Sequence, residues 1–575
     1  MKKSAAVSKP WKNHPLRFPS LGNYILAATL MLLAVRAQGG ASAYQPLPAP
    51  AQYVARATWG ATMLATRAAL LEANASRETI MTVWEKLDRD FPLESDWMLQ
   101  DLGDHHLNWF GRDSAQTMER ELFKPALEEL GAASALRKEI EDLFTKKPLH
   151  DDARWLNLYV RVCEARREQR LRALLKRVPT IVFAQHFNMG GSHYAYTEGQ
   201  SDAQAERNFF PGTKLCRLDF KGTHGRVTTL IRDDDGVIRD PNISWDGQKI
   251  LFAWKKSNRL DDYHLYELDV ATRAVRQITF GLGCADYEGA YLPNGDIVFN
   301  STRPVQTVDC FTTEVSNLYT CDAQGRFMRR LCFDQVHDNF PQVLDDGRVV
   351  YTRWEYQDRG QVFVQGLFQM NPDGTAQTEF YGNNSWFPTS LLHARGIPGT
   401  RKVVAITAGH HSSQAGKLVI VDPDRGRQEA EGVQLVAPIR PTEAVRVDAY
   451  GQEGPLWMYP FPLSEREFLV TFAPLGRKEP RDRFAGHFGI FWMDACGHRE
   501  LLVANPSISC CQPVPLWART VPPVRPSMVD YGKTTGTYYM QNVYEGPGLQ
   551  GVPHGAAKTL RVLSCGIHWG ESQRW

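Results

Sequence analysis

The chain of 575 residues lacks the short motifs by which many enzymes and cofactor-binding proteins are recognised. It contains no CxxCH for covalent attachment of a c-type haem, no GxSxG nucleophile elbow, no HExxH zinc motif and no phosphate-binding glycine loop. The glycine-rich stretch GLGCADYEG (281–289) does not lead into a helical pattern, so we expect no nucleotide site there. No catalytic assignment therefore follows from motifs alone.

An excess of charge of one sign is also missing. The 66 basic and 64 acidic residues give a formal net charge of +2, which provides no electrostatic reason to expect nucleic acid or an anionic lipid surface as a partner. Hydrophobic residues make up 43% and charged residues 23% of the chain, values typical of a globular protein. The length predicts two or three domains.

Long apolar runs are scarce. The run Ile25–Val35 has 11 residues, whereas a transmembrane helix needs about 20. It follows a basic lead and precedes the small residues Ala41–Ala43, so residues 1–43 are predicted to be a signal peptide. We expect a periplasmic or secreted protein with no membrane attachment after cleavage. Because Arg36 follows the apolar run, an uncleaved anchor is the alternative.

The ten cysteines have no regular spacing and form no CxxC pair. Their number is consistent with an oxidising compartment but does not determine which of them pair. Cys510 and Cys511 are adjacent, and a disulfide between adjacent residues is strained. We therefore expect the two not to pair with each other, so that each has a separate fate.

Residues 51–177 have the apolar spacing of helices, three and four residues apart, and predict a helical domain. Ser76, Asp113 and Asp151 stand where helix N-caps are expected. The last helical segment, from residue 153 onward, is strongly basic on one side. A solvated basic face is the simplest interpretation, and a docking surface is the alternative.

From Val178 onward a unit of about 50 residues repeats. Turn glycines 247, 295, 347 and 399 are separated by 48, 52 and 52 residues, and each precedes an apolar strand pattern. A unit of this length with four short strands is typical of a propeller blade. The sequence therefore predicts a mainly β protein: a six-bladed β-propeller over residues 178–510, preceded by the α-helical N-terminal domain and followed by a Pro-rich, incomplete segment (511–575). A second set of markers, one aspartate in the outer hairpin of each unit, comprises Asp219, Asp269, Asp322, Asp373, Asp422 and Asp494.

Two long insertions, 190–212 and 443–461, interrupt the repeat and are candidates for functional loops. Three further loops carry side chains of the types that zinc prefers, namely thiol, imidazole and carboxylate. Loops from successive blades meet near the axis of a propeller, so a shared metal site is one interpretation. The residues concerned are Asp309, Cys310 and Glu314; Asp334, His337 and Asp338; and His410 and His411.

Other interpretations of these loops stay open. His337 is also suited to capping a turn, and Cys310 to a buried apolar position or a disulfide with Cys284 or Cys321. Adjacent residues of a strand point to opposite faces, so at most one of His410 and His411 is expected to face a given site.

Several long segments resemble the middle domain of the hydrazine synthase alpha-subunit family. They are residues 300–361, residues 367–411, VDAYGQEG (447–454) and ISCCQPVPL (508–516), and the resemblance extends over about 240–560. It implies a propeller of the TolB type. In that family the alpha subunit works in a multi-subunit complex, beside haem c groups of a C-terminal domain and a zinc–thiolate site.

The resemblance implies roles for individual residues. Cys310 would supply the thiolate to zinc with His337, His410 and His411 as neighbours, and Tyr539 and Tyr544 lie in the segment that approaches haem in complete relatives. The chain departs from the family in having no CxxCH, so covalent haem c and hydrazine synthesis are not expected of it.

Two functions from different classes follow. The first is a binding or scaffold module for an extracytoplasmic protein partner, such as a redox protein. The alternative is a subunit of a metal- or haem-dependent oxidoreductase whose haem comes from another chain or was lost by truncation. A glycan- or peptide-processing role is a weaker third hypothesis. Whether the chain is an enzyme stays open.

Overall fold

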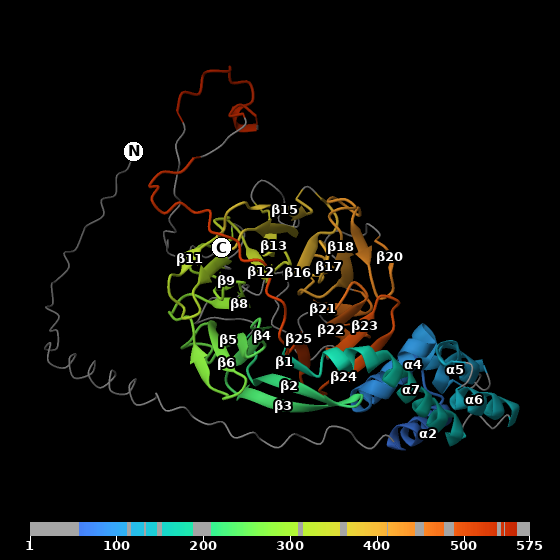
Figure 1. Cartoon of the computed structure of the whole chain (residues 1–575). Coiled ribbons are helices and arrows are strands. Elements are labelled where there is room, and N and C mark those ends of the chain that lie inside the picture. Colours follow the sequence, from blue (N-terminus) through green and yellow to red (C-terminus); the bar gives the residue numbers. More distant parts are fainter. Residues whose placement is uncertain are drawn as a thin grey trace, which may run out of the picture. The chain divides into compact units, whose positions relative to one another are not determined.

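The protein is represented by a computed structural model that describes residues 57–111, 117–131, 134–146, 152–187, 209–308, 314–356, 365–383, 385–410, 412–442, 453–476, 488–537, 542–545 and 547–559. A helical region comes first and a series of β-sheets follows it, as the sequence predicts (Figure 1). None of the helices in the described part of the chain combines the length with the apolar character that crossing a bilayer requires.

The helical region is built around a core of four tryptophans, Trp59, Trp84, Trp97 and Trp109, each at most 1% exposed. Its elements are α2 (Ala57–Glu72), α3 (Arg77–Asp90), α4 (Pro92–Leu102), the 3-10 helix η1 (Gly103–Phe110), α5 (Thr117–Glu129), α6 (Ala135–Lys146) and α7 (Ala153–Arg177).

The starts of two helices can be compared with the predicted caps. The Ser76 hydroxyl accepts the N–H of Thr79 and caps α3, which confirms the first of them. The cap of α7 is Asp152, which accepts the N–H of Arg154 and lies one residue after the predicted position. Asp113 and Asp151 are outside the described residues.

The β-strands form antiparallel sheets arranged around a common centre, as in a β-propeller (Figure 1). Four of the sheets have four strands each. The second, third and last of these follow chain order: β4 (Val237–Ile243), β5 (Lys249–Lys255), β6 (His264–Asp269) and β7 (Val275–Gln277); β8 (Asp286–Tyr291), β9 (Ile297–Ser301), β10 (Asn317–Cys321) and β11 (Arg329–Arg330); and β21 (Leu456–Pro462), β22 (Glu467–Ala473), β23 (Gly489–Asp494) and β24 (Arg499–Val503).

The first sheet is built from both ends of the β region. Its strand order is β25-β1-β2-β3, in which β25 pairs antiparallel with β1. The sheet thus extends past the predicted boundary at 510, because β25 ends at Pro515. The pairing of β25 with β1 joins the C-terminal end of the ring to its N-terminal end. The strands are β1 (Thr180–His186), β2 (Thr213–Lys221), β3 (His224–Asp233) and β25 (Ser509–Pro515).

The remaining sheet has nine strands and corrects the prediction of six separate blades. Its strands belong to two successive sequence repeats, and a parallel pair between Gln365 and Ser390 joins β14 to β16. Hydrogen bonding therefore gives four separate four-stranded blades and one larger sheet. The strands are β12 (Asp338–Val343), β13 (Val349–Trp354), β14 (Gln365–Met370), β15 (Thr378–Tyr381), β16 (Ser390–Gly396), β17 (Val403–Ala408), β18 (Lys417–Val421), β19 (Val433–Leu435) and β20 (Arg440–Pro441).

The hairpin aspartates of the sequence repeat have a structural role. Asp269, Asp322, Asp373, Asp422 and Asp494 each accept a backbone N–H two or three residues further on and so close the turn after the third strand of their repeat. Asp219, in contrast, accepts from the Arg217 and Thr180 side chains. The predicted insertion 443–461 includes the start of the strand β21, while 443–452 and most of 190–212 lie outside the described residues.

The turn glycines adopt backbone conformations that other residues rarely take. Gly247 and Gly399 both have φ of +74°, but a Cβ at Gly247 would lie 2.8 Å from the Trp517 carbonyl carbon, whereas a Cβ at Gly399 would meet nothing within 4 Å. We expect Gly399→Val to lower the free energy of unfolding by about 1–2 kcal/mol through backbone strain alone. Gly247→Val should cost about 1 kcal/mol more, because it also displaces the segment after β25. Urea denaturation of both variants checks this, and equal losses would show that Trp517 does not pack there.

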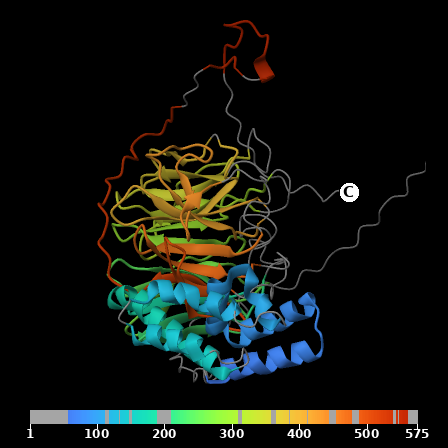
Figure 2. The same cartoon turned by 90° about the vertical axis from the view of Figure 1, so that its right-hand side faces the viewer.

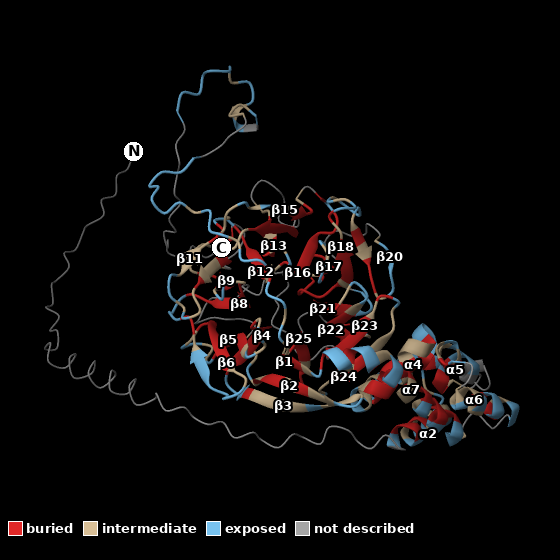
Figure 3. Ribbon diagram, in the orientation of Figure 1, coloured by how far each residue is buried: buried red, intermediate tan, exposed pale blue. Residues whose placement is uncertain are grey.

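Burial is greatest in the strands nearest the centre, and the turns at the rim are exposed (Figure 3). In β8 and β21, for example, every residue is buried. The helices lie against one edge of the sheets (Figure 2), where α4 and α7 contact β24.

Candidate functional site

The structure brings two of the predicted metal ligands to one tryptophan. The His337 ring stacks on Trp354 with centroids 5.8 Å apart, and the His410 ring lies 5.3 Å from the same indole. His337 Nδ1 accepts the N–H of Ser316, and His410 Nδ1 is 2.7 Å from Nε2 of Gln365. The two loops therefore meet around an aromatic side chain.

Other predicted site residues cannot be placed together. Cys310, His411 and Tyr539 lie outside the described residues. Tyr544 is described, and its hydroxyl accepts the N–H groups of Gly555 and Ala557 in its own segment. The assignments of zinc and haem contacts to these residues stay predictions.

A cluster of ligand-type atoms does occur in the predicted loop after β11. One ligand atom each of Cys332, Asp334 and Asp338 lie within 4.8 Å of one another. Arg353 already contacts both carboxylates, at 2.7 Å from Asp334 and 2.9 Å from Asp338. A guanidinium in this position neutralises the acids and opposes a cation, so the cluster does not fit zinc.

Seven of the described cysteines are free thiols, namely Cys163, Cys216, Cys284, Cys321, Cys332, Cys496 and Cys510. Cys284 and Cys321 are buried, and burial raises the pKa of their thiols to about 11 and about 12. Cys510 and Cys511 are also buried.

Sequence reasoning missed a ring of residues at the centre of the sheets. The innermost strand of each repeat contains a β-bulge, where the register with the next strand shifts. At each bulge one residue other than glycine has φ between +45° and +60°. These residues line a central cavity of about 50 Å³, and they are Asp240, Glu288, Phe340, His393, Tyr459 and Gln512.

A sequence signal for this ring exists. In each case the bulge residue is followed by proline or by a small residue, namely Pro241, Gly289, Pro341, Ala394, Pro460 and Pro513. Proline has no N–H to lose from the strand ladder, so it is tolerated at a bulge in a strand that is otherwise paired. The repeated dipeptide precedes most of the turn glycines used to define the repeat.

The bulge residues link neighbouring repeats by hydrogen bonds. Gln512 Oε1 accepts the N–H of Asp240 at 2.8 Å, and Asp240 Oδ2 accepts the N–H of Glu288 at 3.1 Å. Glu288 Oε2 in turn accepts the N–H of Phe340 at 2.8 Å. Each side chain thus satisfies a backbone donor of the next strand, which holds the strained backbone of the ring in place.

Arg239 provides the positive charge that pairs with Asp240 and Glu288. Its side chain is fully buried, and it contacts Asp240 at 2.5 Å and Glu288 at 3.1 Å. The guanidinium also lies over the rings of Tyr263 and Tyr287. Burial raises the pKa of Glu288 to about 8, although Arg239 opposes that shift.

His393 occupies the next position of the ring as a neutral base. Its Nδ1 accepts the N–H of Tyr459, its Nε2 is 3.1 Å from Oε1 of Gln414, and its ring packs 4.2 Å from that of Tyr459. Burial lowers the pKa of His393 to about 3 and that of His186 to about 4.

A pH dependence of stability follows from His393. The unfolded chain binds a proton below pH 6.5, the ordinary pKa of the group, whereas the folded chain does so only near pH 3. The unfolded state then holds more protons between these values, so stability falls as the pH is lowered from 6.5. We expect His393 to contribute a loss of about 3 kcal/mol between pH 6.5 and pH 4, so His393→Gln should lose less than the wild type by that amount while keeping the loss due to His186. Urea midpoints measured across this range test it, and parallel curves for both proteins would contradict it.

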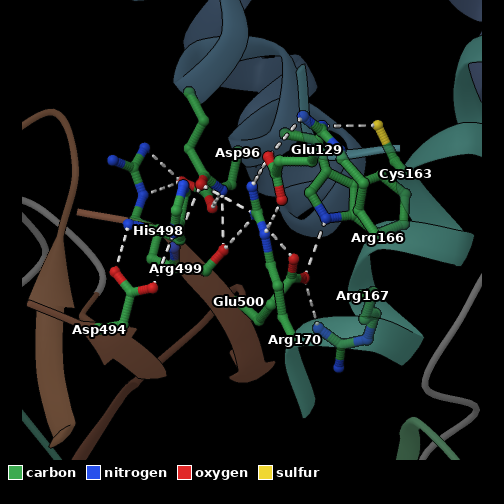
Figure 4. A network of polar contacts seen from close by, with 12 residues as sticks. Asp96, Glu129, Cys163, Arg166, Arg167, Arg170, Asp494, His498, Arg499 and Glu500 are labelled. Carbon is green, nitrogen blue, oxygen red and sulfur yellow. Dashed lines mark hydrogen bonds and ion pairs between the residues drawn. The ribbon is translucent and has the colours of Figure 1, made fainter. Parts of the chain in front are cut away.

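A second polar network joins the helical region to the sheets (Figure 4). Glu500 of β24 is fully buried, and its Oε2 accepts from Trp97 Nε1 and from Arg167 Nη1, both at 3.1 Å. Its Oε1 accepts from Arg170 Nη1 at 3.0 Å. Beside it, Arg499 contacts Asp96 through two nitrogens. Paired charges of this kind fix the position of α7 against β24.

The basic residues of α7 are only partly solvated, so the simpler of the two sequence interpretations holds for some of them and not for others. The exposed ones are Arg154, Arg161, Arg172, Lys176 and Arg177. Arg166 and Arg167 are each 2% exposed. Arg166 contacts Asp101 through two nitrogens at 2.8 and 2.6 Å, and Arg170 contacts Glu129. The helix is a docking surface within the chain itself.

Comparison with known proteins places the sequence beside one curated relative. Subunit alpha of hydrazine synthase from Kuenenia stuttgartiensis is 21% identical over 406 residues, which cover 60% of this chain and 46% of the relative. The chain resembles hydrazine synthase subunit alpha. The resemblance expected from the sequence is thus confirmed, over about half the length of that relative. No protein-family model matches the chain.

Solved structures give similarities of the same kind. Hydrazine synthase of Kuenenia stuttgartiensis is similar with a TM-score of 0.46 at 16% identity, over 60% of this chain and 48% of that chain. TolB from Acinetobacter baumannii has a TM-score of 0.35 at 15% identity, over 58% and 66% of the two chains. Putative TolB from Agrobacterium tumefaciens has a TM-score of 0.34 at 17% identity, over 48% and 84%.

Proposed function

We propose that the chain is an exported β-propeller scaffold that binds an extracytoplasmic protein partner. The observation that carries the proposal is a set of large, exposed apolar side chains on loops. Each of these loops connects either the second strand of a repeat to its third strand or one repeat to the next. The side chains are 51% to 82% exposed, and they comprise Leu260, Phe280, Leu282, Val305, Phe333 and Trp386.

These side chains share one face of the ring. Strands in an antiparallel repeat alternate in direction, so the first and third turns lie on one face and the second turn and the connection to the next repeat lie on the other. All of them belong to the second group. Single exposed apolar residues need no explanation, but a group on one face is typical of a protein interaction surface. We call this group the apolar loop face.

The test is the size of the native assembly in an extract of the source cells. We expect the wild-type protein to elute well above its own mass of 65.0 kDa, and a double variant, Leu282→Asp with Phe333→Asp, to elute as a monomer. Phe327→Asp is the matched control, because Phe327 is 82% exposed on the opposite face. Elution of the wild type as a monomer would contradict the proposal. Export is tested separately: sequencing of the mature N-terminus should begin at Tyr44.

The second candidate is a subunit of a metal- or haem-dependent oxidoreductase. The observation in its favour is the meeting of the His337 and His410 loops at Trp354. A Soret band or stoichiometric zinc in the purified protein would support it, and a blank result would support the scaffold. If zinc is present, Cys310→Ser should abolish it, whereas full retention of zinc would remove Cys310 from the site.

A further inference from the structure

One end of the central cavity is lined by hydrogen-bond donors. Asn242, Gln342 and Arg395 each lie two residues beyond the bulge residue of an innermost strand, in β4, β12 and β16. Because they occupy the same position in their strands, they form a second layer next to the ring of bulge residues. Three amide or guanidinium groups thus face the same small space.

The donors of this layer are not used by the protein. The Arg395 guanidinium packs over the Phe461 ring at 5.2 Å, and none of the described residues accepts a hydrogen bond from it, although the charge of Asp240 favours its protonated form. Asn242 Oδ1 accepts the N–H of Tyr291, and its amide nitrogen donates no hydrogen bond to a described residue. A partly buried arginine without an acceptor is costly, so an acceptor from outside the chain is the expected complement.

A second guanidinium comes from the segment after β25. Arg519 lies 4.5 Å over the Trp245 ring, and its Nη2 donates to the carbonyl of Ile243, the residue that follows Asn242. Its Nε is buried and has no acceptor within the described parts of the chain. Burial and the nearby charge of Arg519 together lower the pKa of Arg395 to about 9.

The acids of the cavity balance only part of these two charges. Asp240 accepts from Arg239, from Gln512 and from the N–H of Glu288, so its oxygens are committed to the ring. Glu288 likewise contacts Arg239, which neutralises one carboxylate of the pair. Three guanidiniums, Arg239, Arg395 and Arg519, thus stand against two acids, which leaves one positive charge in excess near this end of the cavity.

We propose that this end of the central cavity binds a small oxyanion, held by the guanidinium of Arg395 and the amides of Asn242 and Gln342, with Arg519 adding charge from the tail segment. The planar guanidinium fork matches the oxygens of carboxylate or phosphate-type groups. A cavity of about 50 Å³ admits one such group and excludes a whole nucleotide.

The test is calorimetric titration of the full-length protein at constant ionic strength with sodium acetate, formate, phosphate and sulfate. We expect saturable binding of at least one of these anions at one site per chain. Acetate or formate binding would assign a carboxylate ligand, and phosphate or sulfate binding a tetrahedral anion. Arg395→Met should weaken binding at least tenfold, and the milder Gln342→Leu should weaken it several-fold, which keeps the test valid if the first variant does not fold.

Arg401→Met is the matched control, because Arg401 is 66% exposed and pairs with Asp424 away from the cavity. Its affinity should equal that of the wild type. Absence of saturable binding for all four anions would overturn the proposal, as would equal affinities in the wild type, Arg395→Met and Gln342→Leu.

Discussion

Replacement of Glu500 by glutamine is expected to lower the free energy of unfolding by about 3–5 kcal/mol. The two side chains have nearly the same size, so the loss reports the charge. Arg167 and Arg170 would keep their buried guanidiniums but lose the carboxylate that pairs with both of them. Trp97 Nε1 would also have to share a neutral acceptor. Removal of one partner from a buried network leaves uncompensated charge, which costs more than the pair contributes.

Chemical denaturation followed by tryptophan fluorescence measures this change. Glu465→Gln is the matched control, because Glu465 is 45% exposed and pairs with Lys402 at the surface. It should cost less than about 1 kcal/mol. A loss for Glu500→Gln no larger than that of the control would show that the helical region is held to β24 by apolar packing alone.

Arg239→Met is the second large effect, again about 3–5 kcal/mol. Methionine fills part of the same volume but leaves Asp240 and Glu288 as buried acids with no cation between them. The bulges of β4 and β8 depend on these acids, since Asp240 accepts the backbone N–H of Glu288. We therefore expect a lower denaturation midpoint for Arg239→Met. We also expect faster amide hydrogen exchange in β4 and β8, because the bulge residues are held less firmly.

Arg232→Met provides the comparison, because Arg232 is 46% exposed and pairs with Asp234 in a turn. It should leave both the midpoint and the exchange rates near the wild-type values. Equal behaviour of the two variants would mean that the charge of Arg239 is not needed to hold the acids.

The repeat was predictable because its markers are local. A glycine with positive φ and an aspartate that accepts an N–H two or three residues on suit a tight turn, so they recur in the sequence at most of the repeats. The helical region was predictable for the same reason, since its apolar spacing and the cap at Ser76 are local as well. How strands of successive repeats merge into one sheet depends on a single pair, Gln365 with Ser390, which no local pattern indicates.

The polar sites could not be derived in this way. The partners of Glu500 lie 330, 333 and 403 residues away, so the basic character of α7 gave no sign of its burial. The bulge residues differ in type from blade to blade, because the position is defined by backbone conformation and by the proline or small residue that follows. His337 and His410 were chosen for their chemistry, and their common contact with Trp354 became visible only in three dimensions.

The pairing of β25 with β1 has a consequence for synthesis. While the ribosome is still adding residues before Ser509, one edge of β1 has no neighbour, and a free strand edge recruits other chains. Ring assembly therefore waits until residues 509–515 have emerged. A chain cut short ahead of Ser509 should accumulate as insoluble aggregate, and adding back a peptide of residues 509–515 should rescue part of it.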